Sequence, residues 1–156
     1  MRVYADSSFV LRLVLTEPGS PDTVAKYRRL GKPGLFFLPL HSLEVRNGIL
    51  QRTFHQRNSS SPGERKHAAR ERDAAIGRLE QFIALRTLLD VTLPLESVST
   101  RATKLSSAHT ERIGARAIDL LHVAAAITLE SELFLTTDER QAQLAKAEGL
   151  KVVSLA

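Results

Sequence analysis

The chain has no cysteine among its 156 residues, and its five histidines form no cluster. The missing thiols exclude a disulfide framework, a zinc–thiolate site and a cysteine nucleophile. Without cysteine or a group of histidines, a zinc centre is not expected. A chain without disulfides is also suited to a reducing compartment, so we expect the protein to act in the cytoplasm.

Long hydrophobic runs are absent as well. The longest apolar stretch, 118–129, is interrupted by Asp119, His122 and Thr128, and it is too short to cross a bilayer. The first residues lead directly into a strand-like segment, without the basic region and long apolar region of a secretory signal. The sequence therefore predicts no association with a membrane.

The rest of the composition, 43% hydrophobic and 25% charged residues, is that of an ordinary globular protein, and residues 1–156 are expected to form one domain. Short apolar segments alternate with segments of helical periodicity. This pattern is typical of α/β proteins with a mainly parallel sheet covered on both faces. Four to five strands are expected, at 3–5, 35–38, 91–93, 133–135 and 152–155. Helices are expected at 9–15, 21–30, 41–55, 64–88, 96–112, 115–130 and 138–148.

The net charge of +5 comes from one part of the chain. Residues 46–86 contain nine Lys or Arg and four Asp or Glu, so this segment holds the whole excess. We interpret residues 41–88 as a basic helical hairpin whose polar tip projects from the domain and offers a surface for RNA or a second subunit. The alternative is a solvated helical face in which arginines pair with neighbouring glutamates.

Four carboxylates lie in apolar or turn-like surroundings where a surface acid would be out of place: Asp6, Glu44, Asp119 and Asp138. Burial of an unpaired carboxylate is costly, and the sequence shows no matching basic residue beside each of them. We therefore expect the four to share one anionic pocket that binds a divalent cation. Taken singly, Asp6 and Asp138 could each cap the helix that follows, and Glu44 could pair with Arg46 or Arg12.

Chain order supports a common location for these acids. Asp6 and Asp138 follow predicted strands, and Glu44 lies in the first turns of the helix after another strand. Asp119 opens an apolar helix that leads into the next strand, so it could reach the same edge. Sites in open α/β sheets form at the carboxyl ends of the strands. Carboxylate oxygens suit Mg²⁺ or Mn²⁺, which activate water and stabilise charge on a phosphoryl group.

Polar residues near the four acids are candidates for positioning a substrate. These candidates are Ser7, Arg46, Asn47 and Arg116. Each polar neighbour also has a purely structural alternative: Ser7 could cap a helix and Asn47 could simply face solvent. His122, one turn after Asp119, could support the site or be an ordinary packed residue.

The spacing of these segments resembles that of PIN domains of the VapC type, the ribonuclease toxins of VapBC toxin–antitoxin pairs. The resemblance rests on VYADSSFV near the N-terminus, SLEVRNGI after the second strand, AIDLLHVAAA in the late helix and FLTTDERQAQLAKAEGLKVV at the end. It covers nearly the whole chain, and the order of all four motifs is a strong signal.

This resemblance implies a three-layer α/β/α sandwich that cleaves single-stranded or looped RNA with Mg²⁺ or Mn²⁺. It implies a catalytic quartet of Asp6, Glu44, Asp119 and Asp138, with Asp6 and Asp119 as principal metal ligands and Asp138 beside them. Thr136 matches the family's hydroxyl position near the site. A small antitoxin and a second copy of the chain, forming a homodimer, are the implied partners.

Two other functions stay open on the sequence. A non-catalytic PIN-fold module could bind RNA or protein, although a pure binder has no need to keep four like charges together. A structure-specific DNA nuclease is the other, although such enzymes usually carry more acids and additional DNA-binding helices. Residues 58–72 are longer and more basic than expected for short family members, which leaves the RNA target and the dimer geometry open.

Overall fold

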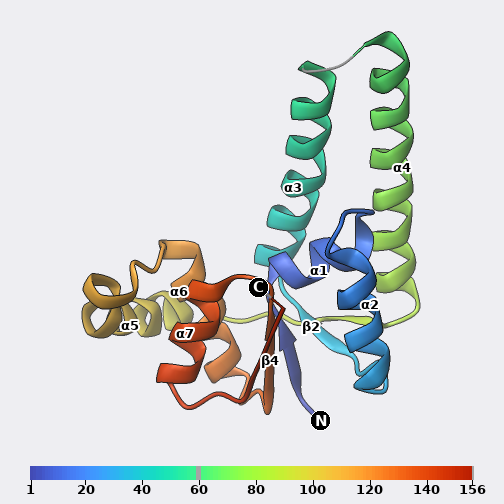
Figure 1. The fold of residues 1–156 in the computed structure, drawn as a ribbon. Coiled ribbons are helices and arrows are strands. Elements are labelled where there is room, and N and C mark those ends of the chain that lie inside the picture. The colour runs from blue at the N-terminus through green and yellow to red at the C-terminus, as the bar shows by residue number, and fades with distance from the viewer. Residues whose placement is uncertain (59–60, 156) are drawn as a thin grey trace.

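The centre of the molecule is a parallel sheet, seen in a computed structural model that describes residues 1–58 and 61–155. Its strands are β1 (Val3–Ala5), β2 (Leu35–Phe37), β3 (Leu88–Asp90), β4 (Leu133–Thr136) and β5 (Val152–Ser154). The strand order is β3-β2-β1-β4-β5, and every pairing is parallel (Figure 1). The predicted α/β sheet of four to five strands is therefore confirmed.

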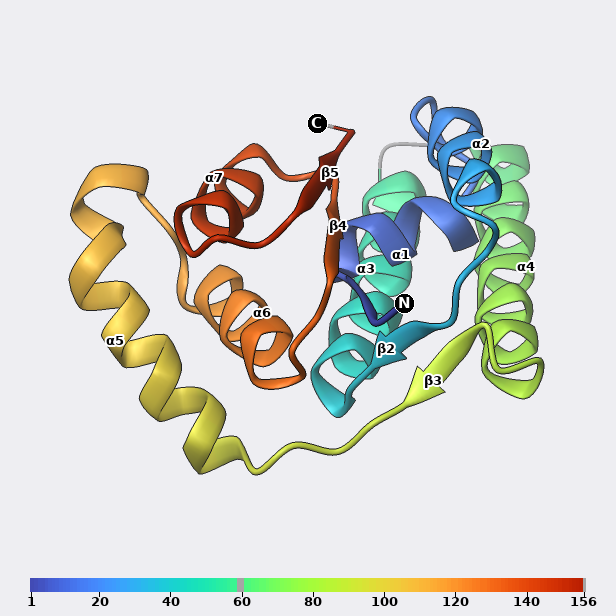
Figure 2. The same ribbon diagram turned by 90° about the horizontal axis from the view of Figure 1, so that it is seen from below.

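Helices cover both faces of this sheet, which gives the predicted three layers (Figure 2). One face carries α1 (Ser7–Val14), α2 (Ser20–Arg29), α3 (Pro39–Asn58) and α4 (Pro62–Ala84). The other face carries α5 (Leu95–Ile113), α6 (Ala117–Thr128) and α7 (Glu139–Ala147). None of the described helices combines the length and apolar character that crossing a bilayer requires.

Alternation along the strands divides the core into two parts. In β1, Val3 and Ala5 pack toward α1–α4, whereas Tyr4 packs toward α5–α7. In β4, Leu133 and Leu135 join the first part, and Phe134 stacks on Tyr4 in the second. Because side chains alternate along a strand, these two short strands supply the centre of both cores. Both β1 and β4 are thus fixed on two sides, which fixes the residues that follow them.

The helices α3 and α4 form a hairpin that extends well beyond the sheet (Figure 1). It spans Pro39 to Ala84, somewhat shorter than the predicted 41–88. Its base packs in the core through Val45, Ile49 and Leu79. Toward the tip the side chains are exposed. Ser59 and Ser60, which stand between the two helices in the sequence, lie outside the described residues.

The third strand is the one element whose predicted position was wrong. The sequence predicts 91–93, but β3 is Leu88–Asp90, which pairs with Leu35–Phe37. The predicted helix continues to residue 88, beyond the end of α4 at Ala84, because the apolar residues before β3 fit its periodicity. In the structure the chain leaves the helix at Arg86, whose φ of 56° is left-handed and ends the helical geometry.

Candidate functional site

A cleft at the carboxyl ends of β1 and β4 collects most of the predicted site residues. The strand order reverses between these two strands, because β2 and β3 lie on one side of β1 and β4 and β5 on the other. Open parallel sheets form their sites at such a point. The cleft has a volume of about 350 Å³. Its lining residues are Ser7, Ser8, Leu11, Glu44, Asn47, Gly48, Gln51, Arg116, Ile118, Asp119, Asp138 and Gln141.

Asp6 lies behind this cleft and is fully buried. Its Oδ1 accepts hydrogen bonds from the Phe9 backbone N–H at 2.9 Å and the Ser8 hydroxyl at 2.7 Å, so the residue does cap α1. Its Oδ2 accepts a hydrogen bond of 2.6 Å from the Thr136 hydroxyl. Burial raises the pKa of Asp6, although nearby His122 and these hydrogen bonds act in the opposite direction. The carboxylate is therefore held in place but is expensive to ionise.

Asp119 is almost as deeply buried, at 1% exposure of its side chain, but it is not unpaired. Its Oδ2 accepts the Arg116 backbone N–H at 2.9 Å and the Arg116 Nε at 3.2 Å. Its Oδ1 accepts Arg116 Nη2 at 3.3 Å. The expectation that no basic residue accompanies this acid is wrong. Arg116 precedes α6, and its guanidinium folds back over the first turn of that helix to reach Asp119.

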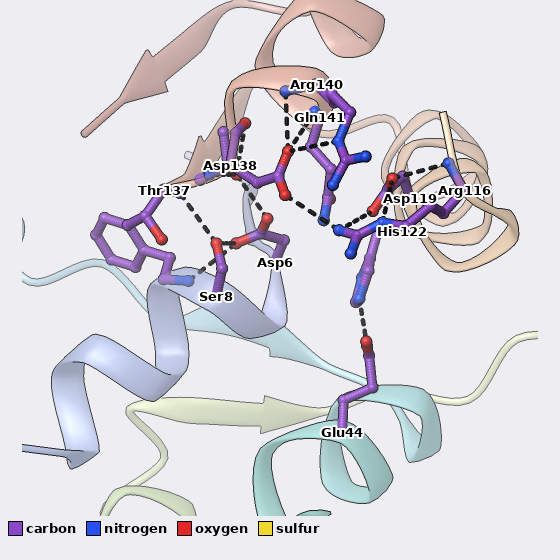
Figure 3. Close-up of polar contacts among 12 residues, drawn as sticks. Asp6, Ser8, Glu44, Arg116, Asp119, His122, Thr137, Asp138, Arg140 and Gln141 are labelled. Carbon is purple, nitrogen blue, oxygen red and sulfur yellow. Dashed lines mark hydrogen bonds and ion pairs between the residues drawn. The ribbon is translucent and has the colours of Figure 1, made fainter. Parts of the chain in front are cut away.

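Asp138 caps α7 and also contacts the same arginine. Its Oδ1 accepts the backbone N–H groups of Arg140 and Gln141 at 2.8 and 3.2 Å. Its Oδ2 accepts Arg116 Nη2 at 3.1 Å. The Arg116 guanidinium therefore bridges Asp119 and Asp138 across the cleft (Figure 3). Its hydrogen bonds to Asp119 are the main reason why the pKa of Arg116 is raised.

Glu44 reaches the cleft from α3, on the side opposite to Asp138 (Figure 3). Its Oε2 accepts the Ser7 hydroxyl at 2.8 Å and contacts His122 Nε2 at 2.5 Å. A carboxylate can only accept, so Nε2 is the donor, and Nδ1 faces the Tyr4 hydroxyl at 2.9 Å. Burial, with Asp6 and Glu44 nearby, keeps the pKa of Tyr4 well above its ordinary value. The phenol stays protonated, and its hydrogen bond with Nδ1 orients the imidazole toward Glu44.

A second buried histidine stabilises the end of β1. His41 Nδ1 accepts the Leu38 backbone N–H at 3.0 Å, so its Nε2 donates to the Ala5 carbonyl at 2.9 Å. Burial lowers the pKa of His41 well below its ordinary value, which keeps the ring neutral. Its ring lies 4.8 Å from that of His122. The backbone immediately before Asp6 is thus held by α3 as well as by the sheet.

Not all of the predicted positioning residues lie in the cleft. Ser7, Asn47 and Arg116 line it, together with three of the four acids. Thr136 is fully buried and connects Asp6 to the turn before α7, since its Oγ1 also accepts the Asp138 backbone N–H at 2.9 Å. Arg46 is exposed and lines a neighbouring hollow to which α4, β2 and β3 also contribute, so the structure does not bring it to the acids.

Gln141 is a residue of the cleft that the sequence analysis missed. It is 5% exposed, and its side-chain Oε1 has no hydrogen-bond partner among the described residues. A buried oxygen without a donor costs about 1–3 kcal/mol, so a ligand that supplies a partner is favoured there. Its position three residues after Asp138, in the first turn of α7, is the signal that could have identified it.

The donors in the cleft fit a hard divalent cation. In the described part of the chain no three acidic or histidine side chains are close enough to hold a metal as they stand. The carboxylates of Asp119 and Asp138 nevertheless already share one positive charge, that of Arg116. The available ligand atoms are oxygens, including the unpartnered Oε1 of Gln141, and Mg²⁺ and Mn²⁺ prefer oxygen ligands.

Comparisons with known proteins agree with this architecture. The family model of the PIN domain matches residues 3–147, so the chain belongs to the PIN domain family. A search of curated proteins finds no match to the chain. The structure is similar to the crystal structure of FitAcB from Neisseria gonorrhoeae, with 18% sequence identity, a TM-score of 0.60, and coverage of 96% of this chain and 95% of that one.

A second similar structure is VapBC2 from Rickettsia felis bound to a DNA fragment from their promoter. It has 14% sequence identity and a TM-score of 0.59, and the match covers 99% of this chain and 98% of that one. At these identities the two likenesses show a shared fold.

Proposed function

We propose that this PIN domain is a metal-dependent endoribonuclease and the toxin of a type II toxin–antitoxin pair. The observation that carries the proposal is the arrangement of the four acids. Glu44, Asp119 and Asp138 line one cleft from α3, α6 and the β4–α7 turn, and Asp6 lies buried behind it at the end of β1. PIN domains are generally nucleases. An RNA substrate would place the activity in the cytoplasm.

The proposed roles follow from the contacts of each side chain. Asp119 and Asp138 would hold a divalent ion with Asp6 behind them, and Gln141 would add a neutral oxygen. Such an ion lowers the pKa of bound water and stabilises charge on the phosphoryl group. Glu44, oriented by Ser7 and His122, would accept a hydrogen bond from the attacking water.

Phosphate contacts come from the rim of the cleft in this proposal. Arg116 and Asn47 line the cleft, and the Arg116 side chain is exposed enough to meet a ligand. The backbone N–H groups at the start of α7 are already engaged by Asp138. Of the Arg116 guanidinium, Nε and Nη2 contact the carboxylates, so the N–H groups of Nη1 can donate to a phosphate.

Purified protein is expected to cleave RNA only when Mg²⁺ or Mn²⁺ is present. The measurement is gel analysis of total RNA with either metal, with EDTA, and with a DNA competitor of matched sequence. Asp119→Asn serves as the inactive control, since the amide oxygen can still accept the Arg116 N–H that caps α6. Cleavage that persists both in EDTA and in this variant would contradict the proposal. Preferential cleavage of DNA would favour the structure-specific DNA nuclease.

The basic hairpin is proposed as the surface that follows the RNA backbone. Arg57 and Arg65 are exposed and line one hollow near its tip, together with Phe54. Replacing both arginines by alanine should weaken RNA binding and reduce the slope of log K against log salt by about 1.4, or about 0.7 for each lost phosphate contact. Fluorescence anisotropy over a salt series measures this slope.

The matched control for this experiment is Arg101→Ala with Lys104→Ala. These two basic residues lie on α5, on the other face of the sheet, and line a separate hollow. They should leave the salt slope unchanged. An equal loss of RNA affinity in both double variants would mean that RNA binding depends on the net charge of the protein rather than on the hairpin.

A protein partner is supported by the surface of α3. Leu43, Leu50 and Phe54 are large apolar side chains that remain exposed along this helix. Exposed apolar groups of this kind are typical of interaction surfaces. We propose that an antitoxin, or a second copy of the chain in a homodimer, covers them, in keeping with the similarity of the fold to the VapBC2 structure.

A non-catalytic binding module is the second candidate. It is favoured by one observation, namely that Arg116 already neutralises Asp119 and Asp138 without a metal. If calorimetry detects no Mn²⁺ binding to a folded protein that binds RNA or a protein partner, this candidate replaces the nuclease.

A further inference from the structure

The guanidinium of Arg116 makes an unusual set of contacts for a surface residue. Its side chain is 59% exposed, yet it forms hydrogen bonds to two carboxylates that belong to different elements, α6 and the turn before α7. Surface ion pairs of long side chains are generally weak, because holding them in one geometry costs side-chain entropy. This arginine is held because the cleft concentrates negative charge.

The two carboxylates share one pattern. In each, one oxygen is fixed by backbone N–H groups: Oδ2 of Asp119 by Arg116, and Oδ1 of Asp138 by Arg140 and Gln141. Among the residues that the structure describes, the other oxygen of each has one partner, Arg116 Nη2, at 3.3 Å from Asp119 Oδ1 and 3.1 Å from Asp138 Oδ2. The backbone contacts would persist if the guanidinium left, and two oriented oxygens would then be available on either side of the place it had occupied.

We propose that Arg116 is an internal competitor of the divalent cation, so that metal binding between Asp119 and Asp138 requires its guanidinium to leave. The inference rests on the metal site of the proposed function. In the metal-free protein the Arg116 guanidinium occupies the place between the two carboxylates, and this raises the metal concentration needed to fill the site. The displaced guanidinium remains at the rim of the cleft, since its backbone is fixed as the N-cap residue of α6.

The test is Mn²⁺ binding to the full chain by calorimetry, without RNA, for the wild type, Arg116→Gln and Arg116→Ala. Both variants should bind Mn²⁺ about threefold to tenfold more tightly, the range expected when one or two half-exposed ion pairs no longer compete. The melting temperature of the metal-free variants should fall, while the rise caused by Mn²⁺ should grow.

Arg140→Ala is the matched control. Arg140 also lies beside Asp138, 3.9 Å from Oδ1, but on the oxygen that backbone N–H groups hold. Its loss should change the affinity for Mn²⁺ by less than about twofold, as expected for a weak exposed pair.

The outcomes separate this inference from the proposed function. Tighter Mn²⁺ binding in the Arg116 variants supports competition, even if none of the proteins cleaves RNA. Equal or weaker binding in folded Arg116→Gln overturns it, as does the absence of Mn²⁺ binding in every variant. Cleavage of RNA by a wild type whose Mn²⁺ affinity is unaffected by Arg116 would leave the nuclease standing without the competitor.

Discussion

Replacing Asp6 by asparagine is expected to abolish RNA cleavage while making the protein more stable at neutral pH. Cleavage should fall by at least about 100-fold, the usual loss when a group that stabilises a charged transition state is removed. The structure explains the gain in stability. The Asp6 carboxylate is fully buried, and burial raises its pKa, so the folded protein pays to ionise it.

The pH dependence of this effect has a defined sign. Because the folded pKa of Asp6 is raised, its favourable contribution is complete below the ordinary pKa of aspartate, about 3.9, and is lost as the pH rises through the folded value. The melting temperature of Asp6→Asn should therefore be close to that of the wild type in acid and higher than that of the wild type at neutral pH. About 1 kcal/mol would appear as a rise of roughly 2–4 °C in melting temperature for a domain of this size.

The measurement is thermal unfolding in EDTA from about pH 4 to pH 8, on either side of the range in which carboxylates titrate. Asparagine can preserve the local bonds, since its oxygen can accept from Phe9 and Ser8 and its amide can donate to Thr136. Asp22→Asn, an exposed acid in the first turn of α2, is the control and should change neither property. A less stable Asp6→Asn at neutral pH would contradict the account of its burial, and undiminished cleavage would remove it from the catalytic set.

Replacing His122 by alanine is expected to cost about 3 kcal/mol of unfolding free energy, because a buried aromatic-sized side chain and its hydrogen bonds are lost together. The ring is fully buried and contacts Tyr4, His41 and Glu44. The melting temperature should fall by roughly 6–12 °C. Cleavage by the remaining folded protein should fall by about tenfold or more, as expected when a partner that orients a site residue is removed.

Two variants distinguish the positioning role from general destabilisation. His122→Gln can place an amide donor near Glu44 and should recover part of the cleavage rate. His109→Ala removes a histidine that is also paired with a glutamate, Glu148 at 2.6 Å, but lies near the surface between α5 and the end of α7. It should leave kcat unchanged. If His122→Gln cleaves no better than His122→Ala at equal folded fraction, then His122 acts only in the core.

Much of the fold could be predicted because its signals are local. Short apolar runs such as 133–135 alternate with helical patterns, and parallel strands buried on both faces need no alternation to be recognised. The approximate position of the acids follows from the same pattern, because Asp6 and Asp138 come directly after strands. The end of α4 could not be predicted, since the left-handed residue Arg86 that follows it carries no sequence signal.

The side-chain connections of the site could not be predicted in this way. Arg116 is three residues before Asp119, a spacing that the sequence displays, but whether its flexible side chain turns inward depends on charges contributed by the distant Asp138. The burial of Asp6 behind the cleft depends likewise on Thr136, from another strand. His122 fits both of its predicted roles, since it is packed in the core and also touches Glu44.

The hairpin of α3 and α4 packs in the core through residues near its base, and this separates its length from the geometry of the cleft. Glu44 and Arg57 are thirteen positions apart on α3, or about 20 Å at 1.5 Å per residue. Two more turns could be added to α3 after Thr53, and two to the facing part of α4. They would move the tip outward by about 11 Å without repacking Val45, Ile49 or Leu79. Related chains could thus differ in the length of hairpin that they offer to a bound nucleic acid, while the side chains of the cleft keep the same arrangement.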